Sequence, residues 1–249
     1  MSGVFLSLVL GDVARRLDAS AGVLVFIDGQ NVHKTCERLY GHGYVHPVLL
    51  AQRVLAGRTL RGFRYYSGMP DPRVAPGRHA AAQRRHNLIR LTGGTVVERP
   101  LRYRWEWGFN PRTLPDPLQH RAETREVAVS PYQRAREKGI DLTLGLDVVD
   151  LALRGSMDVA VVISSDADLT EVARAVHEMT RTQGRVSVEA GVLNEQRAPI
   201  LLRHYDYTHQ LRRNDFEEAR DSFDYRNPLD RRLQEAFLAT CTPLRPRST

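Results

Sequence analysis

The 249-residue sequence predicts an α/β fold in which helices cover both faces of a mainly parallel sheet. Short apolar runs of strand length alternate with stretches that have a helical pattern. Two of these runs end in aspartates, as buried parallel strands do when they deliver side chains at their carboxyl ends. Hydrophobic residues make up 42% of the chain, and the length suits one large domain with appendages.

The first half of the chain is expected to contain three strands and three helices. The run VLVFI at 23–27 is continuous and apolar, which is typical of a buried parallel strand. Glycines at 41 and 93 are expected to end the helices before them. Strands are expected at 23–27, at 60–67 and from 95 onward, and helices at 31–40, 48–56 and 78–91.

The second half is irregular at first and then alternates again. Prolines at 111, 115, 117 and 131 interrupt residues 100–132, so we expect an inserted extended hairpin or a loop there. Helices are then expected at 141–153 and 168–182, and strands at 158–163 and 185–190. A short helix is expected around 230–238 in a charged tail.

These patterns divide the chain into a main domain at 22–211, an amphipathic N-terminal extension at 1–21 and a charged C-terminal extension at 212–249. No apolar run approaches the roughly 20 residues of a membrane span. Cys36 and Cys241 lack the spacing of a zinc site or a disulfide framework. A cytoplasmic protein without membrane contact is therefore expected.

The basic residues are almost all arginines. Lys and Arg total 36 against 29 acidic residues, giving a net charge of +7, yet Lys34 and Lys138 are the only lysines. Because the planar guanidinium suits bidentate phosphate contacts, this composition favours a polyanionic partner such as RNA. The codon preference of a GC-rich genome would give the same composition, so charge alone does not decide between them.

Aspartates from three separate segments are expected to meet at one edge of the sheet. Asp28 follows the first strand, Asp166 and Asp168 follow the strand at 158–163, and Asp141 begins the preceding helix. Clustered carboxylates repel unless a proton or cation neutralises them, and ligation by oxygen alone favours Mg²⁺ or Mn²⁺. Such a site suits the hydrolysis of phosphodiester bonds by an activated water.

Each acid also has a purely structural interpretation. Asp28 could form a turn before Gly29, while Asp141 and Asp168 could cap their helices. Asn31 could cap its own helix or turn its amide toward Asp28 or a metal-bound water. Asp147 lies about 120° around the helix from Asp141, so we expect it to assist the metal-binding acids without binding the metal itself.

At these residues the sequence resembles the NYN domain family of PIN-like ribonucleases, which is related to the LabA-type proteins. The matching segments are VFIDGQN at 25–31, KGIDLTLGLD at 138–147 and VVISSDADL at 161–169. The resemblance implies a PIN-like three-layer α/β/α sandwich, an Mg²⁺ or Mn²⁺ site and cleavage of RNA. It implies that Asp28, Asp141, Asp166 and Asp168 hold the metal, with Asn31 and Asp147 supporting them.

Two positions depart from the family pattern. Ser165 stands where the family has glycine, and Leu169 stands where it has an aromatic residue. The serine is expected to alter the turn's approach to phosphate, although every acid is retained.

A basic surface is expected to hold the RNA backbone. The candidate residues for it are Arg84, Arg85, Arg102, Arg104, Arg134 and Arg136. Next to them, the aromatic residues Tyr103, Trp105, Trp107 and Phe109 alternate with period two, so in a strand all four share one face. Exposed, this face would stack unpaired bases; buried, it would be the packing face of a hairpin or a subunit interface of a homo-oligomer.

The leading hypothesis is a metal-dependent ribonuclease, an endonuclease acting on single-stranded or structured RNA. The alternative is an RNA-binding or protein-interaction module with a catalytically silent pocket. A phosphatase acting on small phosphoesters is disfavoured, because Gln30 stands where a haloacid-dehalogenase motif has its second aspartate.

Overall fold

The computed structural model describes residues 19–108, 130–182, 184, 186–192, 204–228 and 231–239, and its centre is a parallel six-stranded sheet. The strand order is β3-β2-β1-β6-β7-β8, and every neighbouring pair is parallel. The strands are β1 (Gly22–Asp28), β2 (Thr59–Met69), β3 (Thr95–Pro100), β6 (Val159–Ile163), β7 (Ser187–Val192) and β8 (Tyr207–Gln210). The predicted α/β class is therefore confirmed, although β8 was not predicted from the sequence.

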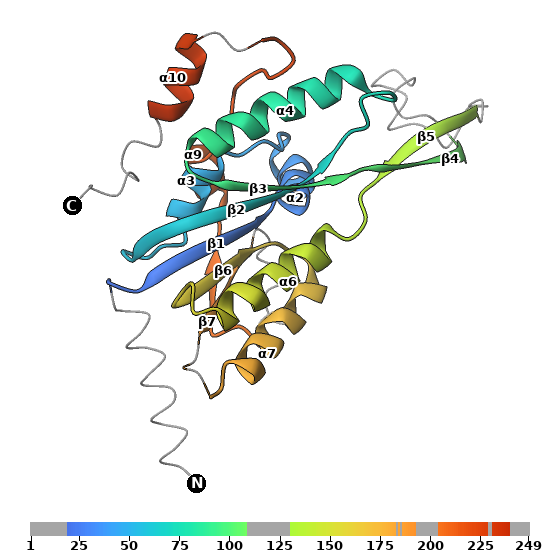
Figure 1. The fold of residues 1–249 in the computed structure, drawn as a ribbon. Helices are drawn as coiled ribbons and strands as arrows, with labels where there is room; N and C mark the ends of the chain where they lie inside the picture. Colours follow the sequence, from blue (N-terminus) through green and yellow to red (C-terminus); the bar gives the residue numbers. More distant parts are fainter. Residues whose placement is uncertain are drawn as a thin grey trace.

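Helices cover both faces of this sheet and complete three layers (Figure 1). The longer helices are α2 (Gly29–Tyr40), α4 (Pro76–Leu91), α6 (Ile140–Leu153) and α7 (Thr170–Met179). The shorter ones are α3 (Pro47–Gln52), α9 (Arg213–Glu218), α10 (Arg231–Ala239) and the 3₁₀ turn η1 (Ala167–Leu169). None of the helices in the described ranges has the length and apolar character needed to cross a membrane.

Each face of the sheet carries its own hydrophobic core, because successive side chains of a strand point to opposite faces. On β1, Val25 and Ile27 enter the core under α2, α3 and α4, whereas Phe26 enters the core under α6 and α7. Burial on both faces explains why the run is continuously apolar rather than alternating.

The expected insertion contains a two-stranded antiparallel ribbon. Its strands are β4 (Arg102–Gly108) and β5 (Ser130–Arg136), which pair with each other and form a sheet of their own. In Figure 1 the ribbon projects away from the central sheet. Residues 109–129, which include Phe109 of the aromatic pattern, lie outside the described residues, as do residues 1–18.

The segment after residue 211 packs against the main domain. Phe216, Tyr225 and Phe237 are buried in the same core as Ile89 of α4. The hydroxyl of Tyr225 donates to Asp221, which is paired with the buried Arg85. The described part of this charged tail therefore contributes to the hydrophobic core.

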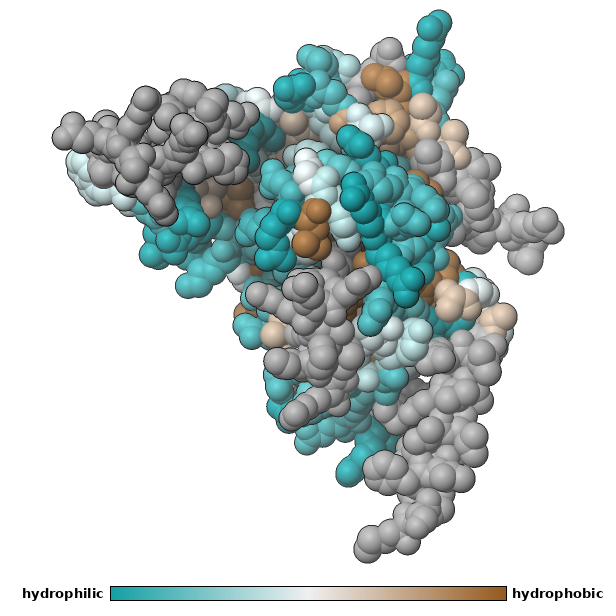
Figure 2. Space-filling model, turned by 180° about the vertical axis from the view of Figure 1, so that it is seen from behind, coloured by the Kyte–Doolittle hydropathy of each residue, from teal (hydrophilic) through white to brown (hydrophobic). Residues whose placement is uncertain are grey.

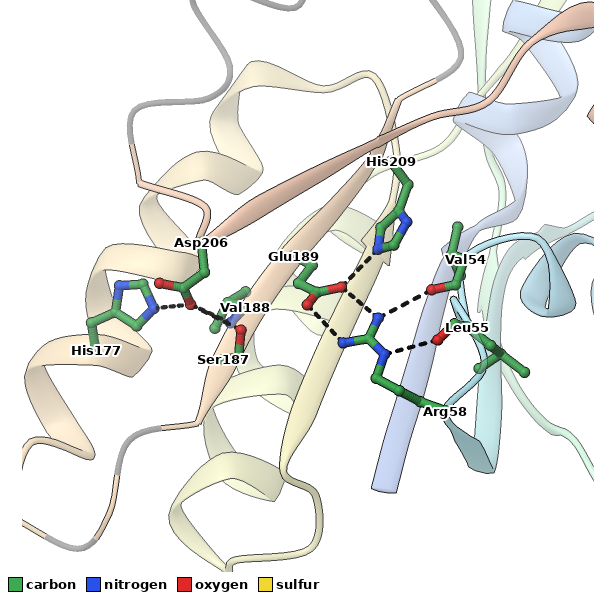
Figure 3. A network of polar contacts seen from close by, with 9 residues as sticks. All are labelled: Val54, Leu55, Arg58, His177, Ser187, Val188, Glu189, Asp206 and His209. Carbon is green, nitrogen blue, oxygen red and sulfur yellow. Dashed lines mark hydrogen bonds and ion pairs between the residues drawn. The ribbon is translucent and has the colours of Figure 1, made fainter. Parts of the chain in front are cut away.

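A second buried ion pair ties β7 to the loop before β2 (Figure 3). Arg58 donates two hydrogen bonds of 2.8 Å to Glu189, and its other donors reach the carbonyls of Val54 and Leu55. His209 of β8 lies 2.7 Å from the same carboxylate. Burial acts to raise the pKa of Glu189, but the bonds from Arg58 and His209 outweigh it and hold that pKa below its ordinary value.

Candidate active site

The candidate site lies at the carboxyl edge of the sheet, between β1 and β6. The chain proceeds from β1 outward to β2 and β3 on one side, and β6 to β8 lie on the other. Such a change of direction leaves a crevice at the carboxyl ends of the two central strands, where ligands bind in open α/β sheets. The start of α2, directly after Asp28, and the turn after Ile163 meet at this point.

Asp28 is held in place by the first turn of α2 and by the turn after β6. It caps α2 by accepting a hydrogen bond from the backbone nitrogen of Asn31 (2.9 Å), and Ser164 Oγ donates to its other oxygen (3.2 Å). The residue is buried, and burial raises its pKa to about 6. These two hydrogen bonds oppose the shift, while the charges of Glu137 and Asp166 add to it.

Asn31 and Ser164 fix the turn that carries Asp166. Asn31 Oδ1 accepts a hydrogen bond from the Ser165 backbone nitrogen (2.8 Å), and Ser164 Oγ accepts one from the Asp166 nitrogen (3.1 Å). The amide oxygen of Asn31 therefore braces the neighbouring turn. Ser165, which replaces the family's glycine, has a buried Oγ without a hydrogen-bond partner in the part of the chain that the structure describes.

A cavity of about 300 Å³ opens beside these residues. Four carboxylates line it, from the ends of β1, β5 and β6 and from the first turn of α6: Asp28, Glu137, Asp141 and Asp166. Lys34 and Lys138, the chain's two lysines, line the same cavity. The site thus combines a cluster of acids with both of the compact ammonium groups available to the protein.

Glu137 is an acid of this cavity that the sequence did not suggest. One of its oxygens accepts a hydrogen bond from the nitrogen of Ile140, the first residue of α6 (2.8 Å). Its other oxygen lies 2.7 Å from the Gln30 amide nitrogen in the orientation that hydrogen bonding favours. Burial raises the pKa of Glu137, and the charge of Asp141 raises it further. The charges of Lys34 and Arg99 oppose this shift. The sequence feature that could have indicated Glu137 is its position just before the start of a predicted helix.

Asp166 and Asp168 take different positions. Asp166 lines the cavity and caps η1 by accepting a hydrogen bond from the Asp168 nitrogen (3.0 Å). Asp168 itself is exposed and does not line the cavity. Asp141 does line it, as the second residue of α6 after the cap at Gly139.

Asp147 also lies apart from the cavity. It accepts hydrogen bonds from Arg64 (2.9 Å) and from the hydroxyl of Tyr66 (2.8 Å), both on β2. These bonds join α6 to β2 and give Asp147 a structural role in the sheet.

The cavity residues fit a hard divalent cation bound partly through water. No three acidic, histidine or cysteine side chains among the described residues converge closely enough to hold a metal ion by themselves. Mg²⁺, however, commonly binds through one or two carboxylates, several waters and the phosphates of a substrate. Burial raises the pKa values of Asp28 and Glu137, and a cation bound in the cavity would favour the charged form of both carboxyl groups.

Arg85 is not the surface contact for RNA that the sequence suggested. It is buried, with its guanidinium donating to Tyr65 Oη (2.7 Å), the Val45 carbonyl (2.8 Å) and Asp221 (3.3 Å). These bonds join α4 to the C-terminal segment, so Arg85 has a structural role in the core instead of a place on the basic surface.

The other candidate arginines differ in what they contact. Arg84 donates to the backbone carbonyls of Tyr225 and Arg226, so it also holds the C-terminal segment. Arg102, Arg104, Arg134 and Arg136 all lie on the β4–β5 ribbon.

Fold and site together define an α/β protein with an acidic cavity at the point where its strand order reverses. A family model for the NYN domain matches residues 22–211, and the chain belongs to this family of PIN-like nucleases. No curated protein matches the chain. A crystal structure of a protein of unknown function from Vibrio parahaemolyticus is similar in fold, with a TM-score of 0.50 and 15% identity over 80% of this chain and 97% of that one.

Proposed function

We propose that the protein is a metal-dependent ribonuclease, an endonuclease that hydrolyses phosphodiester bonds of RNA at the acidic cavity. The observation that carries the proposal is the meeting of Asp28, Glu137, Asp141 and Asp166 in one cavity of an NYN-family chain. Three of these four acids are ones that the family motif marks. Their position at the carboxyl edge is where the α/β sheet places ligands.

The acids would hold Mg²⁺ or Mn²⁺, with Asp28 and Asp166 supplying oxygens from the two central strands. A divalent cation bound there supplies charge neutralisation and lowers the pKa of water. Asn31 and Ser164 keep the two carboxylates in place through the hydrogen bonds of the Asp166 turn. Because neither carboxylate needs to move, little reorganisation accompanies the reaction.

Lys34 and Lys138 would hold the phosphate beside the acids. Both line the cavity, and each ammonium group is a compact charge with three donors. The N-termini of α2 and α6 also face this region, since residues 29–31 and Ile140 belong to their first turns. Helix N-termini favour phosphate groups through their free backbone N–H groups and their dipole.

The test is cleavage of labelled RNA by the full chain in Mn²⁺, Mg²⁺ or chelator, with DNA of the same sequence in parallel. Asp166→Asn is expected to lower the rate by at least about 100-fold, because it removes a charge needed in the transition state. Asp150→Asn is the matched control, since Asp150 is exposed on α6 and pairs only with Arg154 among the described residues. Full activity of Asp166→Asn, or cleavage that persists in chelator, would refute the proposal.

A second candidate function is an RNA-binding module without turnover. The observation in its favour is Ser165, whose buried and unpartnered hydroxyl occupies the turn where the family has glycine. RNA affinity without Mn²⁺-stimulated cleavage in the same assay would support this alternative. A Ser165→Gly variant that gains cleavage would identify the serine as the cause.

A further inference from the structure

The β4–β5 ribbon has one aromatic face. Directly opposed residues of an antiparallel pair share a face, and the register pairs Tyr103 with Ala135 and Trp107 with Pro131. Trp105 and Trp107 are 68% and 76% exposed. Tryptophan is usually well buried, so two of them side by side in solvent indicate a binding surface.

The opposite face of the ribbon is basic. It carries Arg102 paired with Arg136, and Arg104 paired with Arg134. Glu106 forms ion pairs with Arg134 and Arg136. Within the described residues, Arg102 and Arg104 have no ion-pair partner, so the face keeps an excess of positive charge.

The ribbon begins at the same edge of the sheet as the acidic cavity. β4 starts two residues after β3 ends, and β5 ends one residue before Glu137, which lines the cavity. The base is fixed, because Leu101 donates a backbone bond to Met69 and the Tyr103 hydroxyl accepts one from the Asp71 nitrogen. Figure 1 shows the ribbon extending outward from this edge. A polymer bound along the ribbon would therefore be led to the cavity.

We infer that the ribbon binds single-stranded RNA, with unpaired bases stacked on Trp105 and Trp107 and with phosphates held by the arginines. Side chains two residues apart on a strand lie about 7 Å from each other, which allows one base to meet each ring. The two strands are only about 5 Å apart, so long arginine side chains of the basic face can reach the edges of the ribbon. This inference deepens the proposed function and rests on RNA being the substrate.

RNA suits this surface better than a protein partner does. Both exposed rings are tryptophans, whose flat faces stack on any base, and no Leu, Ile or Val shares the aromatic face in the paired register. The back of the molecule in Figure 2 is mainly hydrophilic where it is coloured. The four arginines of the opposite face also suit RNA, because the planar guanidinium can make bidentate contacts with phosphate.

Intrinsic fluorescence tests this inference directly, because Trp105 and Trp107 are the only tryptophans in the chain. The full chain is titrated in chelator with a 12-nucleotide oligouridine, and in parallel with an RNA duplex of the same length. We expect the single strand to quench the emission and the duplex to quench it much less. Unchanged emission with the single strand, or equal quenching by both, would overturn the inference.

Substitution separates stacking from charge. In an anisotropy assay with labelled oligouridine, Trp105→Ala and Trp107→Ala are each expected to weaken binding about tenfold, and Trp107→Phe much less. Circular dichroism and a thermal melt establish that the variants fold. Equal affinity of the alanine variants and the wild type would contradict the inference, as would emission that depends on protein concentration, which indicates self-association through this face.

Failure of this inference is distinguishable from failure of the proposed function. Binding is measured in chelator, where hydrolysis is not required, and Asp150→Asn is expected to bind oligouridine like the wild type. Loss of cleavage with normal quenching would count against the nuclease alone. Normal cleavage with no quenching would count against the ribbon alone.

Discussion

Two clusters of buried charge in this molecule differ in how their carboxylates are neutralised. At Arg58–Glu189–His209, each carboxylate oxygen has a cationic or imidazole partner, and the pKa of Glu189 is held low (Figure 3). At the cavity, Asp28 has only a backbone N–H and a hydroxyl, and its pKa is raised to about 6. The carboxylate of Glu189 is neutralised by its own ion pair, whereas Asp28 forms no ion pair within the described residues. This difference is the reason that we propose the cavity as the ligand site.

The largest change in the free energy of unfolding is expected when the buried Arg58–Glu189 ion pair is broken. Glu189→Gln leaves the Arg58 guanidinium buried without its counter-charge, since both side chains are only 1% exposed. Removing one partner of such a pair costs about 3–5 kcal/mol of unfolding free energy. Urea denaturation at pH 7 measures the loss. A change below about 1 kcal/mol would mean that the two clusters are not different in kind.

A substitution at the cavity is expected to increase the free energy of unfolding instead of lowering it. Asp28→Asn keeps an oxygen that can accept from Asn31 but removes an uncompensated buried charge. The pKa of Asp28 in the folded protein, about 6, lies above its ordinary value of 3.8. The wild-type carboxyl group therefore contributes its full stability below pH 3.8, and this contribution is lost as the pH rises through 6. In chelator at pH 7 the variant should be more stable by up to about 3 kcal/mol.

The same urea measurement at several pH values sharpens this prediction. The advantage of Asp28→Asn should shrink as the pH falls from 6 toward 4, because the wild-type carboxyl then becomes protonated in the folded protein. Asp150→Asn provides the control. A destabilised Asp28→Asn variant at pH 7 would show that the carboxylate is structural.

A smaller effect is expected on metal affinity as the pH changes. A proton and a cation compete for Asp28, so the apparent affinity for Mn²⁺ should rise by up to about tenfold per pH unit below 6 and level off above it. Fluorescence or calorimetric titrations at pH 5, 6 and 7 measure this slope. A flat profile would separate Asp28 from the metal.

The smallest effect is expected for Asp168→Asn. Asp168 is exposed and contributes its backbone nitrogen, rather than its side chain, to the Asp166 turn. Stability should change by less than about 0.5 kcal/mol, and cleavage should fall far less than in Asp166→Asn. Equal loss of cleavage in the two variants would place Asp168 in the site as the family resemblance implies.

The sequence predicted the parts of the fold and site that depend on local pattern. The apolar run of β1 placed Asp28 at a strand end, and the strand before Asp166 placed that acid at the same edge. Glu137 was not predicted as a cavity residue, because its place in the cavity depends on where the β4–β5 ribbon returns to the sheet. Arg85 was misread because its burial depends on Asp221, which lies 136 residues away.

The central claim is that the unpaired carboxylates of the cavity share a divalent cation, and calorimetric titration of Mn²⁺ into the apoprotein at pH 7 tests it most directly. Wild type and Asp150→Asn are predicted to bind Mn²⁺ with the same affinity, and Asp28→Asn and Asp166→Asn are predicted to bind it at least tenfold more weakly. Equal binding by all four proteins, or none by the wild type even with a non-hydrolysable RNA present, would contradict the account.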